Sequence, residues 1–321
     1  MVELWAVMGD IAVSVSTPID PRVGYRRLRD TGAQPLFCLS SVPVPAQARL
    51  VHSDVAEESF CTVHTAPYLI ELRCSTDRLG HDGTALLQVV QMILERLLQR
   101  SGAASLVAAC VRLPSGCGAL LLGGRGAGKT STAIALCETA GGRLVANDMC
   151  VVGLYEGQPV AVAGSRELCI RHEAAVRNFP WLLPRLPIAR PSGWSGKIPI
   201  RPEDVGLSTT REPTPVTGAY VLRIDASVPL HTMEADPRRM RYELYENTAR
   251  IVRGSATPLL RGDGHGFAAC LPSLDDEVCH KSRAGLVETL VTTVGLVEVT
   301  GPAGDAAQWI AADAASRVVR P

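Results

Sequence analysis

The chain has 321 residues, which is enough for one large domain or two. Hydrophobic residues make up 46% and charged residues 20%, and the formal net charge is +0 without a basic run; this composition suits a globular protein and argues against a nucleic-acid or anionic-membrane partner. No stretch approaches about 18 consecutive apolar residues, and the first residues lack a signal-peptide pattern, so we expect a cytoplasmic protein without a membrane span.

Residues 1–102 are predicted to form a β-rich region that ends in a connecting helix. Strand-length apolar patterns occupy residues 11–16, 60–64 and 68–73. From Thr84 to Arg100 the apolar residues recur at helical spacing, and Gly102 marks the end of this helix. We therefore expect a domain boundary after residue 102, with residues 103–321 forming a second domain.

The second domain opens with strands that lead into a glycine-rich loop. Residues 105–113 are predicted to be a strand, and a turn at Pro114 returns the chain into a second strand, 117–122. The next residues fill the template Gly-x-x-x-x-Gly-Lys-[Ser/Thr], the phosphate-binding P-loop, and 131–137 are predicted to be the helix behind it. The residues expected to contact the nucleotide are Gly123, Gly124, Arg125, Gly126, Ala127, Gly128, Lys129, Thr130 and Ser131.

Each residue type in this loop has a physical reason. Glycines let backbone N–H groups turn inward around the phosphates, on a path where a Cβ would clash. Lys129 would place a positive charge on the β- and γ-phosphates, and the Thr130 hydroxyl would be a ligand for Mg²⁺. The helix that follows would direct the positive end of its dipole at the anion. The pattern therefore predicts that ATP, or a closely similar nucleotide, binds together with Mg²⁺.

A carboxylate is predicted at the end of the next strand. Residues 143–148 have the pattern of a strand that ends in Asp148, and such a strand end lies beside the phosphates in α/β sheets. Asp148 is therefore the candidate for the second Mg²⁺ ligand and for the group that orients the acceptor hydroxyl, with a turn-capping aspartate as the alternative. A β-hairpin follows, and beyond it Glu167 is a weaker candidate metal ligand; a surface strand glutamate is an equal alternative.

The proline-rich stretch 178–215 is predicted to be irregular and to shape the substrate site. Only three of the 32 basic residues are lysines, and a lysine that persists in an arginine-rich chain marks a position where a compact ammonium group is required. Lys197 is therefore a candidate catalytic residue that would neutralise the transferring phosphoryl group or the substrate. A solvated loop lysine is the alternative reading.

Strands and helices alternate in the last third of the chain. The predicted elements are a strand at 217–224, a helix at 236–253, a helix at 282–293, a strand at 295–300 and a helix at 304–318. A polar glycine-rich loop contains Arg261, Asp263 and His265. Arg261 is a candidate for contact with the γ-phosphate and His265 for accepting a proton, while a glycine turn with solvated side chains is the alternative.

The run from about 105 to 225 resembles the HPr kinase/phosphorylase family and its relatives on the phosphoenolpyruvate-carboxykinase-like fold. The P-loop and the strand end Leu144-Val-Ala-Asn-Asp148 carry the resemblance. The segment 195–205 is similar to the Lys-x-x-[Ile/Val]-x-Pro-Glu segment of HPr-kinase-like small kinases encoded in bacterial biosynthetic clusters. The resemblance implies an α/β fold with a P-loop nucleotide-binding core, a mixed sheet with flanking helices, and a β-rich N-terminal region before it. It also implies ATP and Mg²⁺ and favours a homo-oligomer.

One position departs from the family pattern. The family usually has an acidic residue in the proton-transfer role where this chain has Asn147, and an amide cannot accept that proton. Phosphoryl transfer depends mainly on positioning and charge stabilisation, so the forward reaction can survive this change. We therefore do not expect the reverse, phosphorylase reaction.

These observations predict an ATP-dependent kinase that phosphorylates a hydroxyl of a small molecule, a peptide or a protein serine. Two other classes stay open: a P-loop NTPase, and a nucleotide-binding regulatory protein without turnover. The sequence lacks a Leu-Ser-Gly-Gly-Gln segment and an Asn-Lys-x-Asp segment, which argues against the transporter-type and GTPase-type NTPases. Acceptor-dependent release of ADP distinguishes the kinase from both alternatives.

The ten cysteines carry no Cys-x-x-Cys pair and no Cys/His ligand spacing. Most lie within apolar runs, so we expect buried thiols in a reducing compartment, and neither a disulfide framework nor a zinc site.

Overall fold

The computed structural model describes residues 1–318 except for the segments 31–34, 56–59, 66–67, 80–82, 187–196 and 254–272. The chain divides into two compact units. The N-terminal unit comprises Met1–Gly102 and Thr248–Arg283, and the P-loop unit comprises Ala103–Asn247 and Ala284–Pro321. The chain therefore passes from one unit to the other after Gly102, and the later segment Thr248–Arg283 groups with the N-terminal unit.

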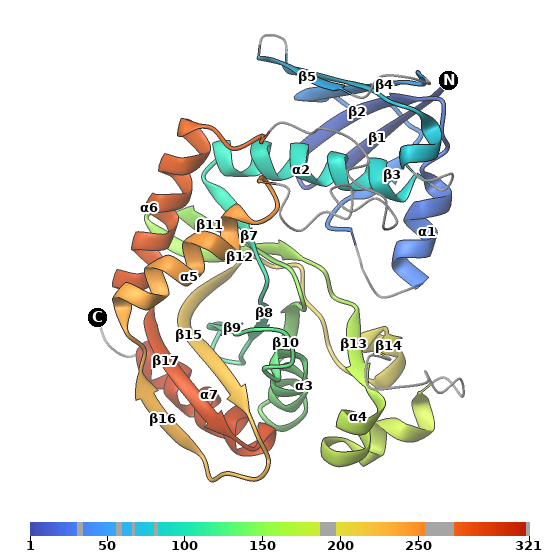
Figure 1. The fold of residues 1–321 in the computed structure, drawn as a ribbon. Helices are drawn as coiled ribbons and strands as arrows, with labels where there is room; N and C mark the ends of the chain where they lie inside the picture. Colours follow the sequence, from blue (N-terminus) through green and yellow to red (C-terminus); the bar gives the residue numbers. More distant parts are fainter. Residues whose placement is uncertain are drawn as a thin grey trace. The chain divides into compact units, whose positions relative to one another are not determined.

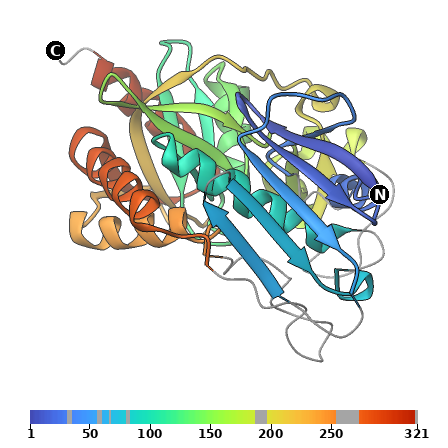
Figure 2. The same cartoon turned by 90° about the horizontal axis from the view of Figure 1, so that it is seen from above.

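A six-stranded mixed sheet forms the centre of the N-terminal unit, in the order β3-β1-β2-β4-β6-β5 (Figure 2). Its strands are β1 (Val2–Met8), β2 (Ile11–Thr17), β3 (Cys38–Ser40), β4 (Ala48–Ser53), β5 (Phe60–Thr65) and β6 (Tyr68–Arg73). The helices are α1 (Arg22–Asp30), the 3₁₀ turn η1 (Thr76–Leu79) and α2 (Thr84–Arg100). The β-rich character of this region and the bounds of α2 agree with the sequence pattern, because α2 buries a continuous apolar stripe.

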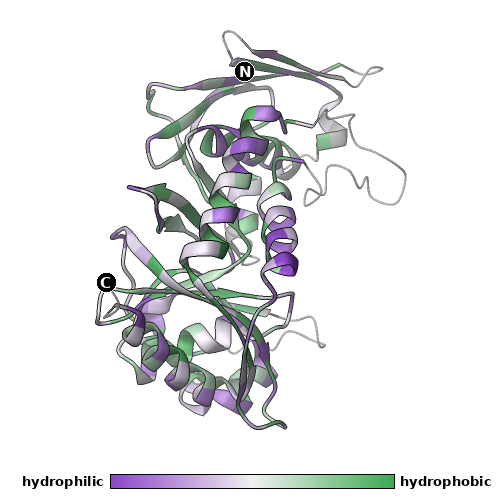
Figure 3. Cartoon of the chain, turned by 90° about the vertical axis from the view of Figure 1, so that its left-hand side faces the viewer, coloured by the Kyte–Doolittle hydropathy of each residue, from purple (hydrophilic) through white to green (hydrophobic). Residues whose placement is uncertain are grey.

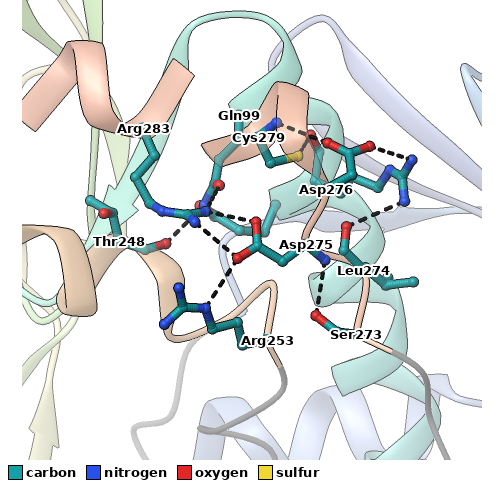
Figure 4. Close-up of polar contacts among 11 residues, drawn as sticks. Gln99, Thr248, Arg253, Ser273, Leu274, Asp275, Asp276, Cys279 and Arg283 are labelled. Carbon is teal, nitrogen blue, oxygen red and sulfur yellow. Dashed lines mark hydrogen bonds and ion pairs between the residues drawn. The ribbon is translucent and has the colours of Figure 1, made fainter. Parts of the chain in front are cut away.

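A buried arginine ties the returning segment to α2 (Figure 4). The Arg283 side chain, which is 0% exposed, donates to Gln99 Oε1 over 2.6 Å and pairs with the Asp275 carboxylate over 2.9 Å. Gln99 in turn donates to the carbonyl oxygen of Thr248 over 2.8 Å. A buried charge is tolerated only when it is paired and hydrogen-bonded, so these contacts explain why the segment belongs to this unit.

A second polar cluster lies on the same helix. Arg96 forms an ion pair with Asp276 at 2.7 Å and donates to the carbonyl oxygen of Leu274 over 3.2 Å. Asp276 also accepts a hydrogen bond from the Cys279 amide over 2.8 Å, which is the capping contact at the start of helix α6 (Glu277–Thr293). The start of α6, five residues before the predicted one, follows from this cap.

A nine-stranded mixed sheet forms the centre of the P-loop unit (Figure 1). Its strands are β7 (Ala103–Leu106), β8 (Ala109–Arg112), β9 (Gly118–Leu122), β10 (Arg143–Ala146), β11 (Cys150–Tyr155), β12 (Gln158–Gly164), β15 (Thr214–Ile224), β16 (His231–Glu234) and β17 (Gly295–Gly301). The main path runs β10-β8-β9-β15-β12-β11-β7, and β17 pairs with both β15 and β16. Strands β9, β15 and β17 are parallel to one another, and the other pairs are antiparallel.

Helices cover both faces of this sheet. The remaining elements are α3 (Lys129–Thr139), β13 (Leu168–Arg171), α4 (His172–Asn178), η2 (Pro180–Arg185), β14 (Lys197–Ile200), η3 (Pro202–Val205), α5 (Pro237–Ala249) and α7 (Ala303–Val318). Side chains of α3 and α7 share one apolar core with the sheet, and side chains of α5 and α6 share the other. Hydrophilic and hydrophobic stretches alternate along the helices, as expected when one face of each lies in a core (Figure 3). The α/β fold class and the flanking helices predicted from the sequence are confirmed.

Two sequence predictions about these elements were wrong. The single strand expected at 105–113 is two strands, because β7 pairs with β11 whereas β8 pairs with β9 and β10. The break between them contains Val107, whose amide donates to the Asn247 side chain over 2.8 Å instead of to a neighbouring strand. The stretch 178–215, expected to be irregular, contains η2, β14 and η3 among its described residues.

Candidate nucleotide-binding site

The P-loop joins β9 to α3, so the order strand, glycine loop, helix is present as the motif requires. Gly123, Gly126 and Gly128 have φ values of 133°, 86° and 95°, in the left-handed region that favours glycine. A Cβ on Gly123 would lie 2.9 Å from the Leu222 carbonyl oxygen, and a Cβ on Gly128 would collide with the Ile224 side chain. Strand β15 therefore supports the loop from behind, and glycine is required at both positions.

The N-terminus of α3 opens onto this loop. Gly128 is the N-cap residue, and no side chain among the described residues caps the helix. The first amides of a helix have no intrahelical acceptor, so they are available to an anion together with the positive end of the helix dipole. Gly124, Arg125 and Gly126 are exposed, and a Cβ on Gly124 or Gly126 would meet no atom of the described chain within 4 Å. The loop is therefore an accessible cradle whose donors suit phosphate oxygens.

The Lys129 ammonium group lies over the loop. Its Nζ donates to the carbonyl oxygens of Gly123 and Gly124 at 2.7 and 3.0 Å. These contacts keep the positive charge beside the cradle formed by the glycines. An ammonium group so placed is suited to contact the β- and γ-phosphates.

The Thr130 hydroxyl, predicted from the sequence to be a Mg²⁺ ligand together with Asp148, is hydrogen-bonded to Asn147. Thr130 Oγ1 donates to Asn147 Oδ1 over 3.0 Å, and Asn147 Nδ2 donates to the carbonyl oxygen of Glu167 over 3.0 Å. Because a carbonyl can only accept, the Glu167 contact fixes the amide nitrogen on that side and turns the amide oxygen to Thr130. Asn147 is 1% exposed, so this arrangement is a buried and fully oriented one.

Asp148 lies on the outer side of the same chain segment. Strand β10 ends at Ala146, two residues earlier than expected, and Asp148 is exposed with φ 71°. The alternation between a buried Asn147 and an exposed Asp148 separates the two polar groups. One faces the Thr130 hydroxyl and the other faces outward.

The remaining candidates have different positions. Lys197 begins β14, and its backbone pairs with Arg171 of β13. Arg261, Asp263 and His265 lie outside the described residues. Glu167 meets the site through its backbone carbonyl, as the acceptor for Asn147.

An arginine directly precedes Glu167, whose carbonyl oxygen accepts the hydrogen bond from Asn147. Arg166 is half-buried, and its Nε donates to the carbonyl oxygen of Thr210 over 3.1 Å. Burial lowers its pKa, the nearby Arg211 lowers it further, and the Glu203 carboxylate opposes both. Arginine stays protonated despite such a shift, so this side of the P-loop unit carries positive charge.

Sequence reasoning missed the residues that support the loop. The Ile224 amide donates to the carbonyl oxygen of Ala127 over 3.0 Å, yet these residues are almost 100 positions apart in the chain. The role of Asn147 was also missed, because a motif reading gives weight to the acidic residue beside it. Its position after an apolar strand was the available signal.

No family model matches the chain, and no curated protein matches it. Among solved structures, the chain is similar to the structure titled "Structure of the Hpr(Ser) kinase/phosphatase from Coxiella burnetii", with 14% identity and a TM-score of 0.31. The similarity covers 65% of this chain and 91% of that chain. It is a distant structural similarity.

Within the described ranges, no helix has both the length and the apolar character needed to cross a membrane.

Proposed function

We propose that this chain binds ATP with Mg²⁺ and transfers the γ-phosphoryl group to a hydroxyl of a small molecule, a peptide or a protein serine. The observation that carries the proposal is the loop 123–131, where left-handed glycines precede an uncapped helix N-terminus. Loops of this geometry suit phosphate because they present several amides and a lysine to one anion. The oriented Thr130 hydroxyl adds an oxygen ligand of the kind that Mg²⁺ prefers.

The site residues fit the two groups that the reaction needs. Lys129 and the loop amides would hold the phosphates, while Thr130 and Asp148 would hold Mg²⁺. Asn147 supports this assignment by orienting the Thr130 side chain, and its own amide oxygen is a further neutral oxygen on that side. When bound, Mg²⁺ would neutralise part of the charge on the phosphates.

The proposed transfer makes one bond, breaks one bond and moves one proton. The acceptor hydroxyl oxygen forms a bond to the γ-phosphorus while the bond from that phosphorus to the bridging oxygen breaks, and ADP leaves. The hydroxyl proton passes to the Asp148 carboxylate, whose exposed position supports this role. Lys197 and Arg261 remain proposals for the groups that neutralise the transferring phosphoryl group and contact the γ-phosphate.

The second candidate is a regulatory protein that binds the nucleotide without turnover. Asn147 favours it, because a buried amide lies against Thr130 where the resembling family has an acidic residue. An amide can orient the Thr130 hydroxyl, but it cannot take the proton of the acceptor hydroxyl. Both candidates require the same nucleotide site, so turnover distinguishes them.

The first experiment is calorimetric titration of ATP–Mg²⁺ into the wild type, Lys129→Ala and Lys281→Ala. We expect Lys129→Ala to weaken binding at least ~10-fold, because a charged contact to phosphate is worth about 1.5–3 kcal/mol. Lys281→Ala is the matched control, since this exposed lysine pairs only with Glu277 of its own helix among the ion pairs of the described residues. Unchanged binding in Lys129→Ala, or no binding by the wild type, would refute the nucleotide site.

ADP release is then followed across a panel of hydroxyl-bearing metabolites and peptides. Release that requires one panel member supports the kinase and identifies its substrate class. Release without any acceptor supports an NTPase, and tight binding without release supports the regulatory protein.

A further inference from the structure

The turn that holds Asn147 and Asp148 has an unusual backbone. The Met149 amide donates to the carbonyl oxygen of Asn147 over 3.0 Å, which is a hydrogen bond across a single residue. The residue between them, Asp148, has φ 71°. A hydrogen bond from i+2 to i with a positive φ at the centre is the signature of a γ-turn, which is rare and strained for a residue with a side chain.

One residue, Ser165, contacts both ends of this turn. Its hydroxyl donates to the Asn147 carbonyl oxygen and accepts from the Met149 amide, the latter over 3.2 Å. Its backbone amide donates to the Met149 carbonyl oxygen over 3.0 Å, and its own carbonyl oxygen accepts from the Asn147 amide. Ser165 is 7% exposed, so the hydroxyl is buried against the turn.

The preceding residue lets Ser165 approach so closely. A Cβ on Gly164 would collide with Ala146 and would lie 2.6 Å from the Met149 carbonyl oxygen. Glycine at 164 therefore brings the end of β12 against the end of β10. A buried hydroxyl stabilises the folded state only if it is hydrogen-bonded. Here the Ser165 hydroxyl both donates a hydrogen bond to the turn and accepts one from it.

The strained turn gives successive side chains opposite directions. Asn147 is buried against Thr130, while Asp148 is exposed. A relaxed extended backbone at 148 would change the direction in which the carboxylate leaves the chain. Strain of this kind persists only where surrounding contacts stabilise it, and Ser165 supplies those contacts.

We propose that Ser165 is a positioning residue: it holds Asp148 in the left-handed conformation and thereby fixes the direction of its carboxylate. This inference rests on the proposed function for its purpose, since a fixed carboxylate serves the acceptor hydroxyl. The effect of Ser165 on the backbone conformation of Asp148 can be measured by unfolding, without any turnover. The test of this inference is therefore separate from the test of the proposed function.

The test is a double-mutant cycle on the unfolding equilibrium with Ser165→Ala and Asp148→Gly. In the wild type, removal of the hydroxyl lets Asp148 relax, and the recovered strain offsets part of the lost hydrogen bonding; glycine adopts a positive φ without strain and has nothing to recover. We therefore expect Ser165→Ala to raise the unfolding equilibrium constant about tenfold in the wild type and about a hundredfold in Asp148→Gly. Ser16→Ala, at a buried serine of the N-terminal unit, is the matched control and should give equal effects in both backgrounds.

Equal effects of Ser165→Ala in the two backgrounds would overturn the inference. If Ser165→Ala does not fold, Ser165→Cys replaces it in the cycle, because cysteine keeps the size and weakens the hydrogen bonds. With an acceptor in hand, Ser165→Ala should lower kcat about tenfold with nucleotide affinity unchanged, and Ser165→Thr, which restores the hydroxyl, should recover kcat. A wild type without turnover would refute the proposed function, while the unfolding cycle would still decide the inference.

Discussion

Asp148 combines an exposed carboxylate with a backbone conformation that side chains rarely adopt. A left-handed residue other than glycine costs about 1–3 kcal/mol, and aspartate is among the types that tolerate it best. Asp148 therefore lowers the stability of the folded protein while it supplies a carboxylate, and such a combination is typical of functional sites.

We predict that Asp148→Gly raises the free energy of unfolding by about 1 kcal/mol and lowers phosphoryl transfer by about 10²–10⁴-fold. The reason is that glycine relieves the backbone strain and removes the carboxylate together. Urea unfolding and ADP release measure the two effects. The matched variant Asp148→Asn keeps the side-chain shape, so it should lose transfer without gaining stability. A destabilised Asp148→Gly would contradict the strain argument.

His52 is a buried histidine whose ring is held by polar contacts. Its Nδ1 lies 3.0 Å from Thr17 Oγ1, and its Nε2 lies 3.1 Å from the Cys74 carbonyl oxygen. The carbonyl can only accept, so Nε2 carries the proton and Nδ1 accepts from the Thr17 hydroxyl. Burial lowers the pKa of His52, and the Cys74 carbonyl and the Asp54 charge oppose this shift.

The lowered pKa of His52 predicts a pH dependence of stability. The unfolded chain protonates this histidine below a pKa of about 6.5, whereas the folded chain resists protonation, so stability falls as the pH drops below that value. Urea unfolding between pH 5 and 8 should show a weaker acid loss in His52→Gln than in the wild type. His64→Gln is the control, because His64 is exposed and pairs with Glu71 at the surface. Equal pH slopes in wild type and His52→Gln would refute the prediction.

At the scale of elements, the P-loop depends on the strand behind it. Gly128 contacts Ile224 of β15 so closely that no side chain fits, whereas Gly124 faces open space in the described part of the chain. These two glycines belong to one motif, yet only one of them is fixed by packing. Their substitution therefore separates packing from loop flexibility.

We predict that Gly128→Ala destabilises the protein by about 2–3 kcal/mol, because the added methyl overpacks the contact and the residue has a positive φ. Gly124→Ala should change stability by no more than about 0.5 kcal/mol, since it meets neither obstacle. Thermal unfolding without nucleotide measures both. Similar destabilisation by the two variants would show that β15 does not determine the loop.

The elements that the sequence predicted best are those with strong local signals. Helix α2 has the predicted bounds because its apolar period is long, and the P-loop connects a strand to a helix because the motif is local. The first strand β1, the short helix α1 and the split between β7 and β8 were not predicted, since their pairing partners are distant or their patterns too short. The roles of the site residues stay predictions. The strand pattern could place Asn147 at the end of β10, but its contact with Thr130 could not be derived from that pattern, because the contact depends on the turn geometry after β10.

At the scale of the whole molecule, a buried charge network defines which segments belong together. Arg283 is fully buried between Gln99 and Asp275, and Arg253 pairs with the same aspartate from a more exposed position. Two arginines thus share one carboxylate with different burial. The buried one should matter far more for stability.

We predict that Arg283→Met destabilises the N-terminal unit by roughly 3 kcal/mol, because it leaves Gln99 and Asp275 with lost partners in a buried place. Arg253→Met should cost at most about 1 kcal/mol, as is usual for exposed ion pairs. Hydrogen exchange should show lost protection in α2 and in the described residues of 248–283 for Arg283→Met, with α3 unchanged. Equal loss in α3 would mean that the two units do not unfold separately.

The return of Thr248–Arg283 to the N-terminal unit also has a consequence for biosynthesis and for cloning. A ribosome releases β15 long before its parallel neighbour β17, and it releases α2 long before the residues that neutralise its arginines. Both units must therefore wait for late segments, and co-translational folding cannot finish the first unit before the second is begun. A gene fragment cut after codon 102 should yield an incomplete N-terminal unit, and a fragment begun at codon 103 keeps the whole P-loop unit but carries 248–283 without the rest of its own unit. A version with 248–283 joined to the first 102 residues through a short linker should preserve the N-terminal unit.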